Sequence, residues 1–332
     1  MLGAQISPCL EQGEFQISVN YRQFTADKQY RGGSDLNPAV TSLNTQVISK
    51  MKFMEMDGIY ALNKQLNLTL GIPYIIDGSS SRALPATVAG SPRFVQSASG
   101  VGDITLGASY WLFDCDDNPD QNINVGLSLK IPTGDSKARD QFPNGAGQDI
   151  RSRVVDQSIQ PGDSGWGFIL SFEAFKAVGD FTLFASGAYL FNPDDQNDTL
   201  SAPAFLNPVG PESVPSNIRY NTITDSYIFR AGAGYPIAAL PGLSLNLAGK
   251  IEGAPAEDVI GRTTGFRRPG YFVTVEPGIN YSTDRMTFSF SVPFRVYQYV
   301  EDSLGAPRDS TFADHLFLFS VNYRFGGVSE DD

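Results

Sequence analysis

Residues 286–296 read MTFSFSVPFRV, a stretch in which apolar and polar side chains alternate. Every second residue from Met286 to Val296 is apolar, and the residues between them are Thr, Ser, Ser, Pro and Arg. Successive side chains of a β-strand point to opposite faces of a sheet. The pattern therefore predicts a strand with one face against an apolar medium and the other against water.

The same alternation recurs along the whole chain. Residues 243–252 and 123–131 repeat it, with leucine, isoleucine or valine opposite serine, asparagine, glycine or lysine. Segments of this kind begin near residues 14, 47, 66, 102, 122, 166, 181, 227, 243, 271, 286 and 314. We expect twelve antiparallel strands, and an even number suits a closed barrel.

Long and short connections alternate between these segments. The short ones contain turn residues, as at Gly179-Asp180 and Pro241-Gly242, whereas 135–165 and 192–226 are long and rich in Gly, Pro and Asn. Outer-membrane barrels have short periplasmic turns and long external loops. We predict an all-β, transmembrane, antiparallel up-and-down β-barrel over 14–325, a periplasmic N-terminal segment over 1–13 and a periplasmic acidic tail over 326–332. The two longest loops are expected to fold back into the mouth of the barrel.

The chemistry of the two faces indicates which one meets lipid. One face carries almost no charge, and the other mixes Gly, Ser, Asn, Lys, Arg and Glu. Twelve strands enclose more space than side chains alone fill comfortably. We therefore place the apolar face against lipid and the polar face in the lumen, where every strand still finds two neighbours.

Composition narrows the class of protein further. The net charge is -12, which argues against binding to nucleic acid. No strictly apolar run exceeds four residues, so the sequence offers no membrane-spanning helix. A secretory signal is absent from this chain, and we expect that it has been removed from a protein of the Gram-negative outer membrane.

The last predicted strand ends in Tyr323-Arg324-Phe325. A terminal strand that closes on an aromatic residue resembles the signal read by the bacterial barrel-assembly machinery, which we expect as a partner during biogenesis. Here Gly326 to Asp332 follow that phenylalanine, so the signature is internal. Aromatic residues such as Tyr74, Trp111 and Tyr281 also gather near segment ends, as interfacial girdles would.

The charged residues of the polar face are the candidate functional residues. Counting by strand parity, the inward-pointing set is Glu14, Arg22, Lys130, Glu173, Arg230, Lys250, Glu252, Glu276, Arg295 and Arg324. These charges either form paired scaffolding or build a constriction that sorts solutes by charge and size. The segment around Lys50, Lys52 and Glu55 has mixed parity and cannot be oriented from sequence.

Cys9 and Cys115 are the two cysteines of the chain, and both fall on the predicted periplasmic side. That compartment is oxidising, so they are candidates for a disulfide, with free or partner-linked thiols as the alternative. A disulfide would hold the N-terminal segment beneath the barrel mouth and narrow it.

Enzyme and metal sites find little support. Gly162-Asp163-Ser164-Gly165 copies a serine-protease nucleophile segment, but the only histidine, His315, follows it in the chain. A phospholipase of the outer membrane places serine two residues after its histidine, and this chain has Phe317 there. Aspartates crowd residues 114–120 without calcium-loop spacing. We expect no catalytic residues, no metal and no cofactor.

Residues 99–135 contain GVGDI, TLGASY and IPTGD. This stretch resembles the family named for the meta-pathway of phenol degradation, whose members are outer-membrane barrels commonly described as transporters. Gly165-Trp166-Gly167 and residues 276–281 look similar too. The resemblance implies passage of small molecules, aromatic ones among the candidates, and it brings no catalytic residues with it.

Two hypotheses about function remain open from the sequence. The first is a channel or transporter through which small molecules cross the outer membrane passively. The second is a closed structural barrel that anchors or docks a protein partner in an envelope assembly, favoured by the paired charges, by the segment around Cys9 and by the tail Glu330-Asp331-Asp332. Both hypotheses have lipid and lipopolysaccharide around the barrel, and only the first requires a small-molecule solute.

Overall fold

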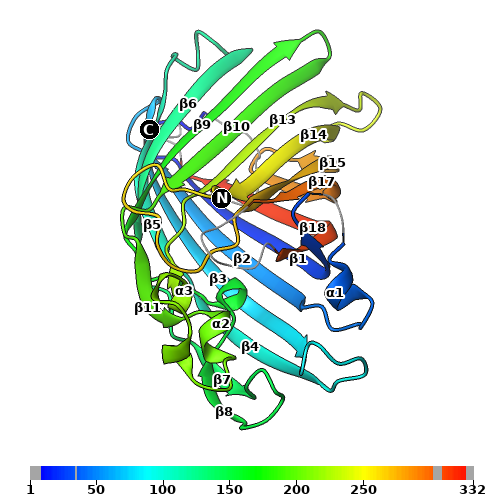
Figure 1. Ribbon diagram of the computed structural model, residues 1–332. Coiled ribbons are helices and arrows are strands. Elements are labelled where there is room, and N and C mark those ends of the chain that lie inside the picture. Colours follow the sequence, from blue (N-terminus) through cyan, green and yellow to red (C-terminus); the bar gives the residue numbers. More distant parts are fainter. Residues whose placement is uncertain (1–8, 34–35, 302–308, 327–332) are drawn as a thin grey trace.

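Fourteen strand elements form one closed antiparallel sheet, the barrel seen in Figure 1. The computed structural model describes residues 9–33, 36–301 and 309–326. The barrel elements are β1 (Phe15–Arg31), β2 (Ile48–Ala61), β3 (Leu66–Ala83), β4 (Arg93–Val101), β5 (Ile104–Trp111), β6 (Gln121–Ile131), β9 (Gly167–Val178), β10 (Phe181–Phe191), β13 (Ser226–Pro236), β14 (Leu243–Ala254), β15 (Gly270–Ser282), β16 (Met286–Ser291), β17 (Phe294–Val300) and β18 (Asp309–Phe325).

Two of the strands are each interrupted once. β4 and β5 both pair with β3 and are separated at Gly102-Asp103. β16 and β17 both pair with β15 and are separated at Val292-Pro293, where proline has no N–H to donate. Counting each interrupted strand once gives twelve strands, as the sequence predicts.

The barrel closes between its first and last strands. β1 pairs with β18 from Phe15 opposite Phe325 to Arg31 opposite Asp309. This pairing leaves neither strand as an open edge, which a barrel in hydrocarbon requires.

The alternating pattern is realised with its apolar face outward. Leu127 is 56% exposed and Leu247 is 57% exposed, whereas Lys130 and Lys250 on the opposite face are buried. Other exposed apolar residues of the wall include Leu106, Leu129, Leu170, Leu183, Leu245, Val296, Phe317 and Phe319. Such an extended apolar surface is unfavourable in water, so the outer face of the barrel is its lipid-facing face.

One of the predicted girdle residues points the other way. Tyr74 and Tyr281 are exposed on the outside, as expected, but Trp111 is fully buried. Its ring packs edge-on against Phe175, with the ring centroids 6.1 Å apart. Trp111 lies opposite Asn124 in the sheet, so strand parity turns it inward and its prediction as an interfacial residue is wrong.

The connections fall at two ends of the barrel. The turn end carries 62–65, 112–120, 179–180, 237–242 and 283–285, and the loop end carries 32–33, 36–47, 84–92, 132–166, 192–225 and 255–269. The connection 84–92, which we predicted to be long, has the same length as the connection 112–120. The predicted strand starts at 66 and 102 are far apart because β3 extends to Ala83 and β4 begins at Arg93.

The loop-end connections contain short elements of their own. These are α1 (Pro38–Thr41), β7 (Arg139–Phe142), β8 (Arg151–Val154), the 3-10 helix η1 (Gln157–Ile159), β11 (Gln196–Leu200), α2 (Ala202–Phe205), the 3-10 helix η2 (Pro211–Ser213), α3 (Ser216–Arg219) and β12 (Tyr220–Thr222). In Figure 1, α2, α3, β7 and β8 gather at the lower left. Leu84, Phe142, Val154 and Phe205 form a buried cluster that holds three of these connections together.

The structure also settles the orientation of β2. Glu55 and Asp57 point into the lumen, while Lys52 points outward and pairs with Asp77 of β3 at 3.1 Å. Lys52 and Asp77 are 46% and 55% exposed. The parity appears mixed in the sequence because the outward face is charged near the loop end and apolar at Met54 and Met56.

Among the described residues no helix is long and apolar enough to cross a membrane. Residues 1–8 of the predicted N-terminal segment and residues 327–332 of the predicted acidic tail lie outside the described part of the chain.

Candidate functional site

The lumen contains two chambers arranged along the barrel. The turn-side chamber has a volume of about 590 Å³ and is lined largely by Ser, Thr, Asn and Gly residues of the inward faces. The loop-side chamber has a volume of about 370 Å³ and is lined by inward residues of five strands together with loop residues such as Asp156 and Arg268. Both volumes fall in the range of roughly 300–1,000 Å³ typical of small-molecule sites.

The boundary between the chambers can be located on two strands, β1 and β14. On β1 the turn-side chamber is lined up to Tyr21 and the loop-side chamber from Arg22. On β14 the last turn-side residue is Lys250 and the first loop-side residue is Ala254. Glu252 lies between these two, so Arg22 and Glu252 stand where the chambers meet.

An ion pair crosses the lumen at this level. Arg22 Nη2 of β1 lies 2.7 Å from Glu252 Oε1 of β14. β1 and β14 are not neighbours in the sheet, because β15, β16/β17 and β18 lie between them. The contact is therefore a bridge across the barrel and not a ladder along its wall.

The bridge continues into a chain of charges along the wall. Lys250 Nζ lies 2.8 Å from Glu252 and 3.1 Å from Glu276, and Arg230 Nε lies 2.7 Å from Glu276. We name these four residues and Arg22 the boundary chain. Glu276 is only 1% exposed, and a buried carboxylate is tolerated when cations neutralise and hydrogen-bond it.

A second acidic pair lines the turn-side chamber and was missed by the sequence reasoning. Glu55 and Asp57 lie two residues apart on β2, so both point inward. Asn20 Nδ2 of β1 donates to Asp57 Oδ2 at 2.7 Å. Strand parity could have found these carboxylates only if the orientation of β2 had been known.

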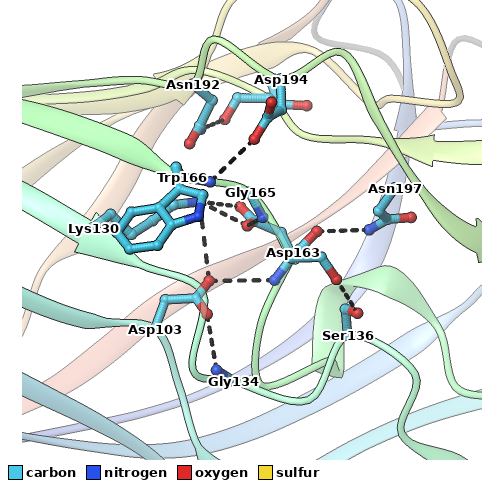
Figure 2. Close-up of polar contacts among 12 residues, drawn as sticks. Asp103, Lys130, Gly134, Ser136, Asp163, Gly165, Trp166, Asn192, Asp194 and Asn197 are labelled. Carbon is cyan, nitrogen blue, oxygen red and sulfur yellow. Dashed lines mark hydrogen bonds and ion pairs between the residues drawn. The ribbon is translucent and has the colours of Figure 1, made fainter.

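A further ion pair fixes the long loop to the inner wall where β4 and β5 separate (Figure 2). Lys130 of β6 donates to Asp163 Oδ1 at 2.7 Å, and its Nζ lies 3.9 Å from Asp103. Asp103 in turn accepts from the backbone N–H of Gly134 at 2.9 Å and of Asp163 at 3.3 Å. Asn197 donates to the carbonyl of Asp163 at 2.9 Å, which ties the second long loop to the first.

Asp156 lines the loop-side chamber and anchors a loop to the barrel wall. Its carboxylate is 1% exposed, accepts a hydrogen bond from Arg82 of β3 and lies 3.8 Å from Arg268. Burial alone would raise its pKa, but the guanidinium groups of Arg82 and Arg268 outweigh burial and hold the pKa of Asp156 well below its usual range. The carboxylate therefore stays charged and keeps the loop against the barrel.

The other predicted lumen charges lie apart from the boundary chain. Glu173 lines the turn-side chamber. Glu14 and Arg324 lie at the turn end, where Glu14 accepts from the Glu11 N–H at 2.9 Å and Arg324 donates to the Asp284 carbonyl at 3.1 Å.

Arg295 lies toward the loop end on β17. Its guanidinium donates to Asp314 at 2.6 Å and to the hydroxyl of Tyr30 at 2.8 Å, and it also contacts Gln298. Of the ten residues predicted from parity, five therefore come together in one chain, and Lys130 belongs to the separate contact with Asp163.

Cys9 and Cys115 are joined by a disulfide, with their Cα atoms 6.1 Å apart. Cys115 lies in the turn-end connection 112–120, so the bond ties the residues before β1 to that connection. Lys64 of a neighbouring turn lies 3.5 Å from Glu11 and also pairs with Asp116.

The residues considered for catalysis do not converge. Ser164 contacts Ser136, whereas His315 lies on the outer face with its ring edge-on to Phe317. Within the described ranges no three His, Cys, Asp or Glu side chains are placed to hold a metal ion.

Solved structures with similar chain traces include the following three. An outer membrane channel from Pseudomonas putida F1 superposes with a TM-score of 0.61 at 17% identity, over 97% of this chain and 100% of that one. The toluene transporter TbuX from Ralstonia pickettii gives 0.43 at 12% identity over 96% and 90%. A FadL homologue from Pseudomonas aeruginosa gives 0.41 at 10% identity over 95% and 90%. The likeness to the Pseudomonas putida channel shows that the fold is that of an outer-membrane barrel.

No curated protein matches the sequence. Residues 58–303 match the family described as "Putative MetA-pathway of phenol degradation", which spans the stretch 99–135 and most of the barrel. The sequence match covers well over half of the chain and agrees with the barrel fold, and the chain therefore belongs to this family.

Proposed function

We propose that the protein is a channel of the outer membrane through which small solutes pass by way of the two chambers. The observation that carries this proposal is that the turn-side and loop-side chambers lie on the two sides of the Arg22–Glu252 ion pair, inside one closed barrel. An ion pair between two side chains can open by changes of side-chain rotamer, without unfolding of the barrel.

The chemistry of the lumen supports passage of water-soluble molecules. The turn-side chamber is lined by hydroxyl and amide groups such as Ser128, Ser171 and Asn246. Where the turn-side chamber meets the loop-side chamber, the boundary chain presents both positive and negative side chains. The electric field of these charges would sort solutes by charge as well as by size. Among small solutes, the family description favours those that carry an aromatic ring.

Removing the bridge tests the proposal directly. Liposomes containing the purified barrel are swollen with neutral solutes of graded size, and Arg22→Ala is compared with the wild type. Arg22→Ala should speed swelling and admit larger solutes, because it removes the side chain that crosses the lumen. Lys52→Ala is the matched control, since Lys52 also forms an ion pair but lies on the outer face.

A folded barrel that admits no solute, whether wild type or Arg22→Ala, would contradict the proposal. That result would favour the second hypothesis, a closed barrel that serves as an anchor or docking partner. A stoichiometric envelope protein should then co-purify with it.

A further inference from the structure

We propose that the loop-side chamber is a binding site for a small aromatic carboxylate, with Arg268 as the group that binds the carboxylate. This inference rests on the proposed function, because it names the class of solute that the pathway would take. It is carried by an arginine that makes no hydrogen bond within the described part of the chain and by phenylalanine side chains that face the same chamber.

Arg268 differs from the other charged residues of the chamber wall. Its guanidinium approaches Asp156 and Asp309 only at 3.8 Å, longer than the roughly 2.7–2.9 Å of a charge-assisted hydrogen bond. Among the described residues it makes no hydrogen bond. The other charged residues of the wall have close partners, namely Arg22 with Glu252, Arg267 with Asp258, Asp156 with Arg82 and Asp309 with Gln29.

The guanidinium is nevertheless held in a fixed place. Its central carbon lies 5.0 Å from the centroid of the Phe266 ring, and Phe266 is 1% exposed. Arg268 itself is about one quarter exposed, so its donors can reach the chamber. A planar guanidinium fixed in this way is suited to two parallel hydrogen bonds with a carboxylate.

The remainder of the wall supplies an apolar surface for a ring. Phe24, Phe272 and Phe312 come from the inward faces of β1, β15 and β18, and all three line the chamber. The rings of Phe272 and Phe312 have centroids 5.7 Å apart at an interplanar angle of 63°. Aromatic rings favour tilted and offset contacts of this kind, so a bound ring could join the group without displacing it.

A second arginine strengthens the preference for an anion. Arg22 lines the floor of the chamber, and its Nε is buried without a hydrogen-bond partner among the described residues. A buried donor without an acceptor is unfavourable, so an oxygen atom brought by a ligand would be stabilised there. The chamber therefore offers guanidinium donors at Arg22 and Arg268 and aromatic side chains at Phe24, Phe272 and Phe312.

The experiment measures binding and does not depend on conduction. Benzoate, benzyl alcohol and acetate are titrated calorimetrically, at neutral pH, into the purified full chain in a non-ionic detergent. Benzoate should bind saturably and at least tenfold more tightly than benzyl alcohol, which lacks the charge, or acetate, which lacks the ring. Equal affinity for benzoate and either of the other probes would overturn the proposal.

Two variants of opposite sign keep the test independent of misfolding. Arg268→Gln should weaken benzoate binding at least tenfold, or about 1.4 kcal/mol. Asp309→Asn should tighten it severalfold, because it removes a carboxylate that competes for Arg268. Arg262→Gln, on the same connection but exposed, should bind benzoate as the wild type does. Wild-type affinity in both Arg268→Gln and Asp309→Asn would also overturn the assignment.

Failure of this inference is distinguishable from failure of the proposed function. A barrel that passes solutes but does not bind benzoate would leave the channel intact and refute the site. A barrel that binds benzoate with the predicted variant effects but passes no solute would establish the site and refute the channel.

Discussion

Replacing Glu252 by glutamine should make the channel more selective for anions. The boundary chain contains three cations, Arg22, Arg230 and Lys250, and two carboxylates, Glu252 and Glu276. Glu252→Gln keeps the shape of the side chain and an oxygen that can accept a hydrogen bond, but removes one of the two negative charges. A permeating ion that passes the boundary level then meets one additional net positive charge.

The magnitude follows from Coulomb's law. One unit charge acting on an ion at 4 Å is worth about 1 kcal/mol at the dielectric constant of bulk water. The change has opposite signs for a cation and an anion, so the difference between their barriers shifts by about 2 kcal/mol. This corresponds to a change of roughly 30-fold in the permeability ratio. Because the Debye length falls from about 10 Å at 0.1 M salt to about 3 Å at 1 M, the effect should shrink at high salt.

The assay is the reversal potential of single barrels in a planar bilayer under a salt gradient. Glu252→Gln should shift the reversal potential toward the equilibrium potential of the anion. The shift should be larger at 0.1 M than at 1 M salt. Asp77→Asn removes a carboxylate of the exposed outer pair with Lys52 and should leave the reversal potential unchanged. An unchanged reversal potential in a folded Glu252→Gln barrel would refute the view that the boundary chain lies on the ion pathway.

Four further predictions concern the fold. Cys115→Ser in a Cys9→Ser background should lower the free energy of unfolding by about 4–5 kcal/mol in the chain-entropy treatment, since the bond closes a separation of 106 residues; thermal melting by circular dichroism checks this against the disulfide-bonded chain. Because the pKa of Asp156 is lowered in the folded protein, its ion pairs stabilise the loop end above the ordinary aspartate pKa of about 3.9 and are lost as pH falls through the lower folded value. Proteolysis of the loops should therefore become faster in strong acid and, for Asp156→Asn, already at neutral pH; equal rates for Asp156→Asn and wild type would contradict this. Gly107→Val should prevent folding, because a Cβ there would lie 2.6 Å from a backbone atom of β6. Leu127→Arg should lower the stability of the barrel in lipid by up to about 2–4 kcal/mol, because it places a charge on the lipid-facing side. The yield of refolded barrel measures both effects.

The wall of the barrel could be predicted from the sequence because strand parity is a local property. The outward faces at Leu127, Leu247 and Phe317 each alternate with polar residues inside a single segment. The start of β4 at Arg93 could not be predicted in this way. Its first residues lie at the loop end, where both faces are polar enough that alternation carries no signal.

The site was predictable only in part, because its geometry depends on closure of the barrel. Parity placed Arg22 and Glu252 on inward faces, but their contact joins strands that are distant in sequence and separated in the sheet. Asp163 and Arg268 belong to connections, which have no parity. Their positions follow from hydrogen bonds with the barrel wall and from stacking on a loop ring, as for Arg268 on Phe266.

The central claim is that water and solutes have a path through the lumen, and single-channel recording of the refolded wild-type barrel in a planar bilayer tests it most directly. The account predicts steady current steps, and larger steps for Arg22→Ala, because that change removes the bridge between the chambers. A demonstrably folded barrel that carries no current, in the wild type and in Arg22→Ala alike, would contradict the claim.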